Sequence, residues 1–425
     1  MSSKANRQHR VSLNSRGDSS LFCLVGIDDT DSARGFCTTY LAYRIAIDLR
    51  DDCPVLPYPR LVRLNPNIPF KTRGNAAVCL RIETRNPDRT FERICKTAER
   101  FSDAEGGANT GLVFLEDLGL VQQLGPLYLD ALHGVVNVHR VAKILREHNV
   151  RHWTQGNGMG IIGAAASLAF DERFDHTYEL ISYRKEKNWG RRRDIDASSV
   201  RRMDAATFPH TFNNYDYQKR KVLIAPHGPD PVFAGVRGDS PRAVLNAFRM
   251  LSYDESLDGH MIYLSNQHTA AHLADKLDWK VYSSGWAEGR VVDAEVGPGG
   301  HVYVAIRSRG SNRLCAVYEP TGDLRRVARR LRTGDTVKLH GGVRRGTRIH
   351  PKVLNVERMD VVRLAHRRQR TDIVAGSYAA SPRANRHLTK PLIRYGNEVS
   401  GKRLGEIEGW LGCEVRQTRV LVRSR

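Results

Sequence analysis

The segment LVGIDDTDSARGFCTTYLA, from Leu24 to Ala42, decides the fold of the N-terminal part of the chain. Its first residues are apolar, which is typical of a buried β-strand. Three carboxylates follow within four residues, at Asp28, Asp29 and Asp31. From Thr38 onward apolar residues recur at helical spacing. A strand, an acidic loop and a helix in this order predict an α/β unit.

The three aspartates are the sharpest chemical signal in the sequence. Like charges at the end of a buried strand repel one another, and a divalent cation between them removes the repulsion. Mg²⁺ binds one or two carboxylates plus phosphate oxygens, and the following helix would direct its N-terminus to the same place. The loop therefore predicts a magnesium–nucleotide site, with Thr38 placed to accept or hand on a phosphoryl group. The alternative is a capped helix start without a ligand.

A basic turn lies in NPNIPFKTRGNAAV, residues 65–78. Lys71 and Arg73 can neutralise phosphate charge, and Gly74 permits close backbone approach. A basic surface hairpin explains the same residues equally well.

The glycines of GNGMGIIGA, residues 156–164, match a GxGxxG spacing through Gly158, Gly160 and Gly163. A lone match of this kind is weak evidence for a dinucleotide site. The preceding RHWTQ is a poor buried strand, which a Rossmann site would need. We therefore expect a glycine-rich loop before a helix that packs closely on a sheet.

Acidic and basic residues also occur in GPDPVFAGVRGDSP, residues 228–241. Asp230 and Asp239 could hold a cationic substrate, with Arg237 between them. They could equally be turn-forming residues, because Asp, Gly and Pro dominate turns.

Composition places the chain among globular proteins. Its 425 residues predict about two to four domains. Apolar runs are too short to span a membrane, and residues 1–20 are polar and basic, which predicts a disordered leader and no signal peptide. The seven cysteines are scattered, which fits a cytoplasmic protein without a disulfide framework.

Patterning predicts a multidomain α+β protein. Residues 21–150 read as an α/β domain, and residues 151–280 as a ferredoxin-like α+β layer. Residues 285–365 read as three strands, a short helix and two strands, which is the pattern of an OB-fold β-barrel, although another small barrel would also fit. Residues 366–425 form a basic C-terminal segment.

The net charge is +21, from 67 basic and 46 acidic residues. Basic runs occur at 184–193, 324–332, 343–348 and 362–370. Four such runs in one chain indicate a polyanionic partner, and nucleic acid is the expected one.

Seven segments, taken in order, resemble the family of archaeal tRNA-isoleucine 2-agmatinylcytidine synthetases (TiaS): VGIDDTDSARGFCTTYLA, RLNPNIPFKTRGNAAV, GNGMGIIGA, TFNNYDY, GPDPVFAGVRGDS, SNQHTAAHL and SPRANRHLTKPL. The resemblance implies an ATP-dependent ligase that attaches agmatine to C2 of the wobble cytidine of the isoleucine tRNA with a CAU anticodon, so that it decodes AUA. ATP is split to AMP and phosphates. One phosphoryl group activates the C2 oxygen, and the agmatine amine then displaces it. A kinase-like domain, a ferredoxin-like domain, an OB-fold and a zinc ribbon are the implied layout.

The resemblance also implies roles for single residues. Asp28, Asp29, Asp31 and Thr38 fall on the catalytic magnesium–ATP motif. The residues expected to lie near ATP are Gly26, Thr30, Lys71, Arg73, Gly74, Gly158, Gly160 and Gly163. The residues expected to lie near agmatine are Asp230, Arg237 and Asp239. Those expected to contact tRNA are Arg325, Arg326, Arg329, Arg330, Arg344, Arg345, Arg367, Arg368, Arg370, Arg386, His387 and Lys390.

One departure from the family pattern concerns its zinc ribbon, which carries two CxxC pairs between the OB-fold and RHLTKPL. The interval here is AHRRQRTDIVAGSYAA, residues 365–380, without a cysteine. We therefore predict no zinc, and expect Arg367, Arg368 and Arg370 partly to replace that module. Neither a membrane nor a protein partner is predicted. The alternatives are a non-catalytic RNA-binding OB-fold protein with a degenerate kinase-like domain, or a related ligase that uses another amine or RNA.

Overall fold

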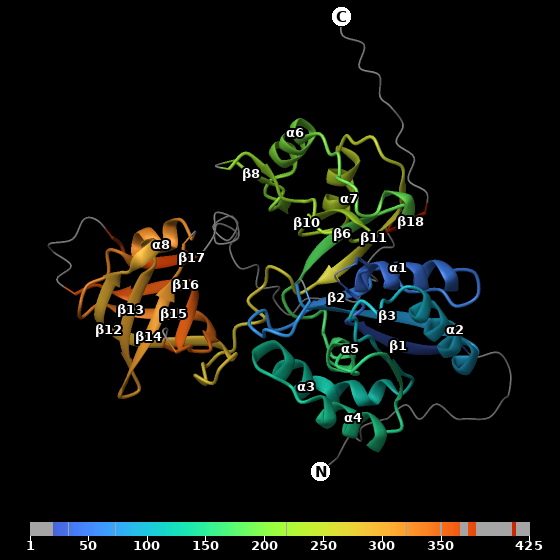
Figure 1. Cartoon of the computed structure of the whole chain (residues 1–425), viewed down its shortest axis with the longest axis horizontal. Coiled ribbons are helices and arrows are strands. Elements are labelled where there is room, and N and C mark those ends of the chain that lie inside the picture. Colours follow the sequence, from blue (N-terminus) through green and yellow to red (C-terminus); the bar gives the residue numbers. More distant parts are fainter. Residues whose placement is uncertain are drawn as a thin grey trace, which may run out of the picture.

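The computed structural model describes residues 20–32, 34–72, 74–217, 219–319, 321–348, 351–365, 373–379 and 410–413. Figure 1 shows a large body built on one long sheet, with a smaller β-barrel beside it. The predicted leader and most of the predicted C-terminal segment lie outside the described residues. None of the described helices has the length and apolar character needed to cross a bilayer.

Ten described strands form the sheet of the large body. In pairing order they are β5 (Arg151–Thr154), β4 (Gly111–Leu115), β1 (Leu21–Asp28), β3 (Ala76–Thr84), β2 (Arg60–Arg63), β11 (Leu257–Ser265), β6 (Thr177–Arg184), β10 (Val232–Gly238) and β7 (Thr211–Phe212), with β18 (Leu411–Cys413) paired to β11. The sheet is continuous because β2 pairs in parallel with β11, through Leu264 opposite Arg60 and Ser265 opposite Leu61. The regions expected as two domains therefore share one sheet.

Helices pack on both faces of this sheet. One face carries α1 (Thr38–Leu49) and α2 (Pro87–Arg100). The other face carries α3 (Val121–His133), α4 (Val138–Glu147), α5 (Ile161–Leu168), α6 (Ala197–Thr207) and α7 (Pro241–Arg249). Shorter elements are β8 (Tyr215–Asp216), β9 (Lys221–Val222) and the 3₁₀ turns η1 (Leu118–Leu120), η2 (Glu186–Asn188) and η3 (Pro298–Gly300).

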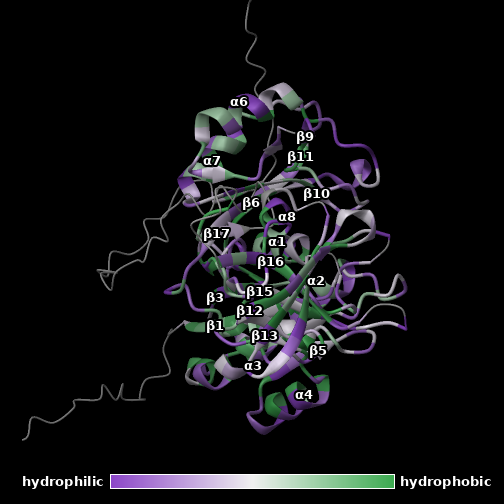
Figure 2. Ribbon diagram, turned by 90° about the vertical axis from the view of Figure 1, so that its left-hand side faces the viewer, coloured by the Kyte–Doolittle hydropathy of each residue, from purple (hydrophilic) through white to green (hydrophobic). Residues whose placement is uncertain are grey.

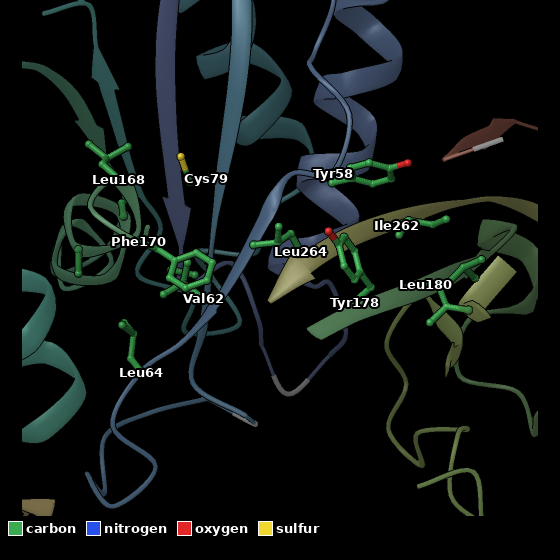
Figure 3. Close-up of a cluster of buried hydrophobic side chains, with 14 of the residues drawn as sticks. Tyr58, Val62, Leu64, Cys79, Leu168, Phe170, Tyr178, Leu180, Ile262 and Leu264 are labelled. Atoms are coloured by element: carbon green, nitrogen blue, oxygen red, sulfur yellow. The ribbon is translucent and has the colours of Figure 1, made fainter. Parts of the chain in front are cut away.

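The hydrophobic core also crosses the expected domain boundary. Val62 and Cys79 come from the first region, and Leu180 and Ile262 come from the second, yet all four belong to one buried cluster (Figure 3). Figure 2 shows apolar strands in the interior and hydrophilic stretches on the covering helices. Burying this apolar surface against both halves makes them one packed unit.

The position of α5 differs from the expected division of the chain at residue 150. β5 and α5 both follow that residue, but β5 pairs with β4, through Leu112 opposite Trp153. Ile161 and Ala164 of α5 belong to the same buried cluster as Val113 of β4. The region that supports the acidic loop therefore extends at least to the end of α5.

The barrel follows the predicted order of three strands, a helix and two strands. Its elements are β12 (Ser284–Val296), β13 (Val302–Ser308), β14 (Ser311–Val317), α8 (Asp323–Ala328), β15 (Thr336–Arg344) and β16 (Val353–Arg363), with β17 (Gly376–Ala379) added to β16. Parallel pairing of β14 with β16, at Cys315 opposite Leu354, closes the five strands into a barrel. Its core includes the fully buried Val304, Ile306 and Leu339.

Candidate active site

The three aspartates of the acidic loop point to different partners. Asp28 Oδ1 accepts the backbone N–H of Asp29 at 2.8 Å, and Asp31 Oδ1 accepts the backbone N–H of Thr38 at 3.0 Å. Asp29 has a left-handed backbone, with φ of 58°. Its carboxylate accepts hydrogen bonds from the side chains of Asn109 and Thr72. In the described part of the chain, no three His, Cys, Asp or Glu side chains gather into a group that could hold a metal. Magnesium binding by Asp28, Asp29 and Asp31 together with phosphate oxygens stays a prediction.

Burial dominates the electrostatics of the loop. Loss of solvent raises the pKa of Asp28 to about 8, and the negative charge of Asp29 adds to the shift. Burial also raises the pKa of Asp29, against the hydrogen bonds that its carboxylate accepts. A cation beside these groups would favour their ionised forms.

The glycine motif brings α5 against β1. A Cβ on Gly163 would lie 1.9 Å from Asp28 Oδ2, and one on Gly160 would lie 2.3 Å from the backbone of β4. On β1 itself, a Cβ at Gly26 would lie 2.0 Å from the carbonyl oxygen of Ala164. Only glycine permits this approach. The expected close packing of a helix on a sheet is confirmed.

The start of α1 is held from both halves of the sheet. Thr30 Oγ1 donates to Thr38 Oγ1 at 3.2 Å, and both side chains are buried. The hydroxyl groups of Tyr183 on β6 and Tyr263 on β11 donate to the carbonyl oxygen of Thr39 at 2.9 and 2.7 Å. Burial raises the pKa of both tyrosines well above its ordinary value, so they remain donors. The Thr38 hydroxyl is therefore fixed in place and does not serve as a simple N-terminal cap.

A cavity of about 220 Å³ lies next to this helix start. Its polar lining comes from α1 and the acidic loop, from β2 and the turn after it, and from β6 and β10: Asp31, Thr38, Thr39, Arg63, Thr72, Glu179, Asp230 and Arg237. Gly74 lines it as well. The structure thus brings the predicted nucleotide residues Asp31, Thr38 and Gly74 together with the predicted agmatine residues Asp230 and Arg237.

Other predicted residues do not line the cavity. They are Gly26, Asp28, Asp29, Thr30, Lys71, Gly158, Gly160, Gly163 and Asp239. Asp239 instead accepts from His210 at 3.0 Å, and the glycines contribute packing. Arg73 lies outside the described residues. Direct contact with ATP or agmatine is therefore best supported for the residues of the cavity wall.

Three charged residues at or beside the cavity were not expected from the sequence. Glu179 is 3% exposed, and its oxygens lie 2.9 Å from Arg237 Nη2 and 3.4 Å from Arg63 Nη2. Arg193 donates to the Asp230 carbonyl at 2.8 Å and lies 3.4 Å from its carboxylate. A glutamate inside the buried strand TYELISYR was the available signal, because ionised residues are seldom buried without partners. Arg193 lies in the basic run 184–193 and Arg63 begins the segment RLNPNIPFKTRGNAAV, but nothing in either segment placed them at this site.

The arginines expected to contact tRNA fall into three groups. Five arginines are exposed, on or just after α8 and at or just after the end of β15: Arg326, Arg329, Arg330, Arg344 and Arg345. Arg325 is half-buried and forms an ion pair with Glu319. The last group lies outside the described residues, as does half of the interval expected to lack the zinc ribbon: Arg367, Arg368, Arg370, Arg386, His387 and Lys390.

Comparison with known proteins gives the family. Two family models match the chain, the TiaS TCKD domain at residues 24–86 and the TiaS FLD domain at residues 158–272. The isoleucine tRNA 2-agmatinylcytidine synthetase TiaS of Cenarchaeum symbiosum (strain A) is 45% identical over 347 residues, which cover 80% of this chain and 77% of that relative. The chain belongs to the TiaS family.

Solved TiaS structures have the same architecture. The complex of TiaS with its isoleucine tRNA and ATP has a TM-score of 0.79 and 31% identity, and the match covers 89% of this chain and 98% of that one. The complex of TiaS with the same tRNA, AMPCPP and agmatine has a TM-score of 0.74 and 32% identity, with 81% and 84% covered. The predicted resemblance to TiaS is confirmed, and so is a multidomain α+β fold.

Proposed function

We propose that the chain is an ATP-dependent ligase that attaches agmatine to C2 of the wobble cytidine of the isoleucine tRNA with a CAU anticodon, releasing AMP and phosphates. Its membership of the TiaS family supports this activity, and so does the TiaS complex with isoleucine tRNA, AMPCPP and agmatine. The structural observation that carries the proposal is the shared cavity, which Asp31 and Thr38 line together with Asp230. Phosphoryl transfer and recognition of a cationic amine can therefore take place in one cavity.

Each end of the cavity has its own chemistry. At the start of α1, the Thr38 hydroxyl is placed to accept or hand on a phosphoryl group, and Asp31 holds the backbone of the same residue. Asp230 lines the same cavity, and its carboxylate, 3.4 Å from Arg193, can accept a hydrogen bond from a terminal group of agmatine without adding net negative charge to the wall. Thr72 links the cavity to the acidic loop, because it lines the cavity and hydrogen-bonds the Asp29 carboxylate.

Asp28 and Asp29 are the residues that fit a magnesium ion. Their raised pKa values mean that the ionised carboxylates lack compensation, which a cation would provide. One or two carboxylates plus phosphate oxygens are a sufficient set of protein and substrate ligands for Mg²⁺. The bound ion would neutralise charge on the phosphates of ATP.

The finer architecture is part of the proposal. We assign the kinase-like role to the region that carries α1 and the acidic loop, and a ferredoxin-like layer to the region of β6, β10, β11, α6 and α7. The barrel has a helix between its third and fourth strands and a parallel pair between its third and fifth, which supports an OB-fold that binds RNA.

The activity is tested by transfer of labelled agmatine to an isoleucine tRNA transcript with a CAU anticodon in Mg-ATP, with AMP followed in parallel. We expect incorporation matched by AMP. AMP without incorporation would indicate another amine or RNA. Neither product, from protein that still binds the tRNA, would favour a non-catalytic RNA-binding protein.

Neutralising two exposed arginines of the barrel is expected to weaken tRNA binding. Arg344 and Arg345 lie at the end of β15, and the Arg344 guanidinium lies 5.9 Å from the ring centroid of Tyr318. Removing two phosphate contacts should lower the slope of log K against log salt by about 1.4 to 1.8. Filter binding of the double variant Arg344→Gln/Arg345→Gln at several salt concentrations measures this. Arg140→Gln on α4 is the control, and a slope equal to that of wild type would remove these residues from the tRNA surface.

A further inference from the structure

A charged triad lies in the part of the cavity wall that β2, β6 and β10 form. Glu179 of β6 lies between Arg237 of β10 and Arg63 of β2, at 2.9 and 3.4 Å. All three side chains line the cavity, and the glutamate is 3% exposed. Two guanidinium groups share one carboxylate, so this part of the wall carries a net positive charge. The neighbouring Asp230 does not offset it, because Asp230 is paired with Arg193.

Both arginines are held in position before any ligand binds. The backbone N–H of Arg63 donates to Asn266 Oδ1 at 2.7 Å, and its Nε donates to Gln267 Oε1 at 3.0 Å. Gly74 leaves room for its guanidinium, since a Cβ there would lie 2.3 Å from Arg63 Nη1. Glu179 fixes Arg237, whose buried Nε has no hydrogen-bond partner in the described structure. A partnerless buried donor is costly, and an anionic ligand would compensate it.

The charge of this wall excludes one occupant and favours another. Agmatine is a double cation, so guanidinium groups repel it. A phosphoryl group presents several anionic oxygens, which arginine binds with paired N–H donors. The earlier placement of Arg237 beside agmatine therefore conflicts with the chemistry of the wall.

We propose that Arg63 and Arg237 bind the phosphoryl group that activates the C2 oxygen of the cytidine, and that Glu179 is the positioning residue for both. This inference rests on the proposed function. In the step that they assist, the agmatine nitrogen forms a bond to C2, the C2–O bond breaks, and the oxygen leaves on phosphate. The amine loses a proton to solvent. The two guanidinium groups stabilise the negative charge that grows on the departing phosphate.

The test separates binding of agmatine from chemistry. We expect Arg237→Gln and Arg63→Gln to lower kcat for agmatine incorporation by about 100-fold or more, while KM for agmatine stays within about threefold of wild type or falls. Arg237→Lys keeps the charge but not the paired donors, so it should recover part of kcat. Glu179→Gln should fall between wild type and the arginine variants. Arg201→Gln, at an exposed position of α6, is the matched control and should behave as wild type.

Each outcome decides a separate question. Wild-type protein that incorporates no agmatine would refute the proposed function, whatever the variants do. If wild type is active, a higher KM for agmatine with unchanged kcat in Arg237→Gln would assign this residue to the amine and overturn the inference. Unchanged kcat and KM in both glutamine variants would overturn it too. Melting temperatures close to that of wild type establish that the variants are folded, and Arg237→Lys provides the answer if a glutamine variant is not.

Discussion

Replacing Asp28 with asparagine is expected to reduce ATP turnover by about 100-fold or more without lowering the stability of the fold. Burial raises the pKa of this carboxyl from 3.8 to about 8, so the folded state disfavours its charge. The group contributes stability that is fully present below pH about 4 and is lost as the pH rises toward 8. Asparagine has nearly the same shape and does not ionise, so its stability is not lost as the pH rises. Turnover falls nevertheless, because the neutral amide cannot act as the anion of a magnesium–phosphate site.

AMP formation and thermal melting between pH 5 and pH 9 measure the two effects on one protein. The gain in melting temperature of Asp28→Asn over wild type should grow with pH up to about 8 and then level off. Asp51→Asn, at a side chain that is 91% exposed, is the control and should change neither quantity. Turnover at the wild-type level would exclude a catalytic role for Asp28. A gain that shrinks as pH rises would contradict the burial of its charge.

Gly163→Ala is expected to cost about 2 to 4 kcal/mol of unfolding free energy and to abolish ATP turnover. The new methyl group would lie 1.9 Å from Asp28 Oδ2 and 3.0 Å from Leu64 Cδ1. Either the carboxylate must leave its position or α5 must move away from the sheet. Both changes disturb the acidic loop, because Asp28 begins that loop.

Gly125→Ala in α3 is the matched control for this substitution. A Cβ at Gly125 meets no atom within 4 Å apart from its chain neighbours, but Pro126 follows it and disfavours a helical residue that carries a Cβ, which offsets the gain in helix propensity; alanine should therefore change the free energy of unfolding by less than about 1 kcal/mol. Urea unfolding of both variants measures the contrast. Equal stability of the two alanine variants would show that contact of α5 with Asp28 is unimportant.

The local pattern of apolar residues was sufficient to predict the strand and helix that flank the acidic loop and the order of elements in the barrel. The apolar run of β1, the helical spacing of α1 and the strand order of the barrel are all readable over short stretches. The directions of the three aspartates were not readable. Successive side chains of a strand point to opposite faces, and the left-handed backbone of Asp29 turns the chain again. Spacing alone therefore placed the carboxylates near one another, where the charges of Asp29 and Asp31 raise the pKa of Asp28, but it did not show which backbone N–H each one accepts.

Long-range pairing accounts for what the sequence could not show. Glu179 lies 116 residues from Arg63, and the hydrogen-bonded Arg63 and Asn266, which join β2 to the end of β11, are 203 residues apart. No period in the sequence encodes which strand ends will meet. A buried charge in an apolar strand marks a residue that needs a partner, but the partner becomes known only from the folded sheet.

The parallel pairing of β2 with β11 has a mechanical consequence. A cleft-closing enzyme swings two rigid lobes about a flexible linker. In this protein such a swing would tear hydrogen bonds between adjacent strands and split a shared apolar cluster. The hydrogen bonds from Tyr183 and Tyr263 to the Thr39 carbonyl also join the start of α1 to β6 and β11. The parts of the cavity wall that α1, β2, β6 and β10 contribute are therefore expected to keep a fixed separation when substrates bind.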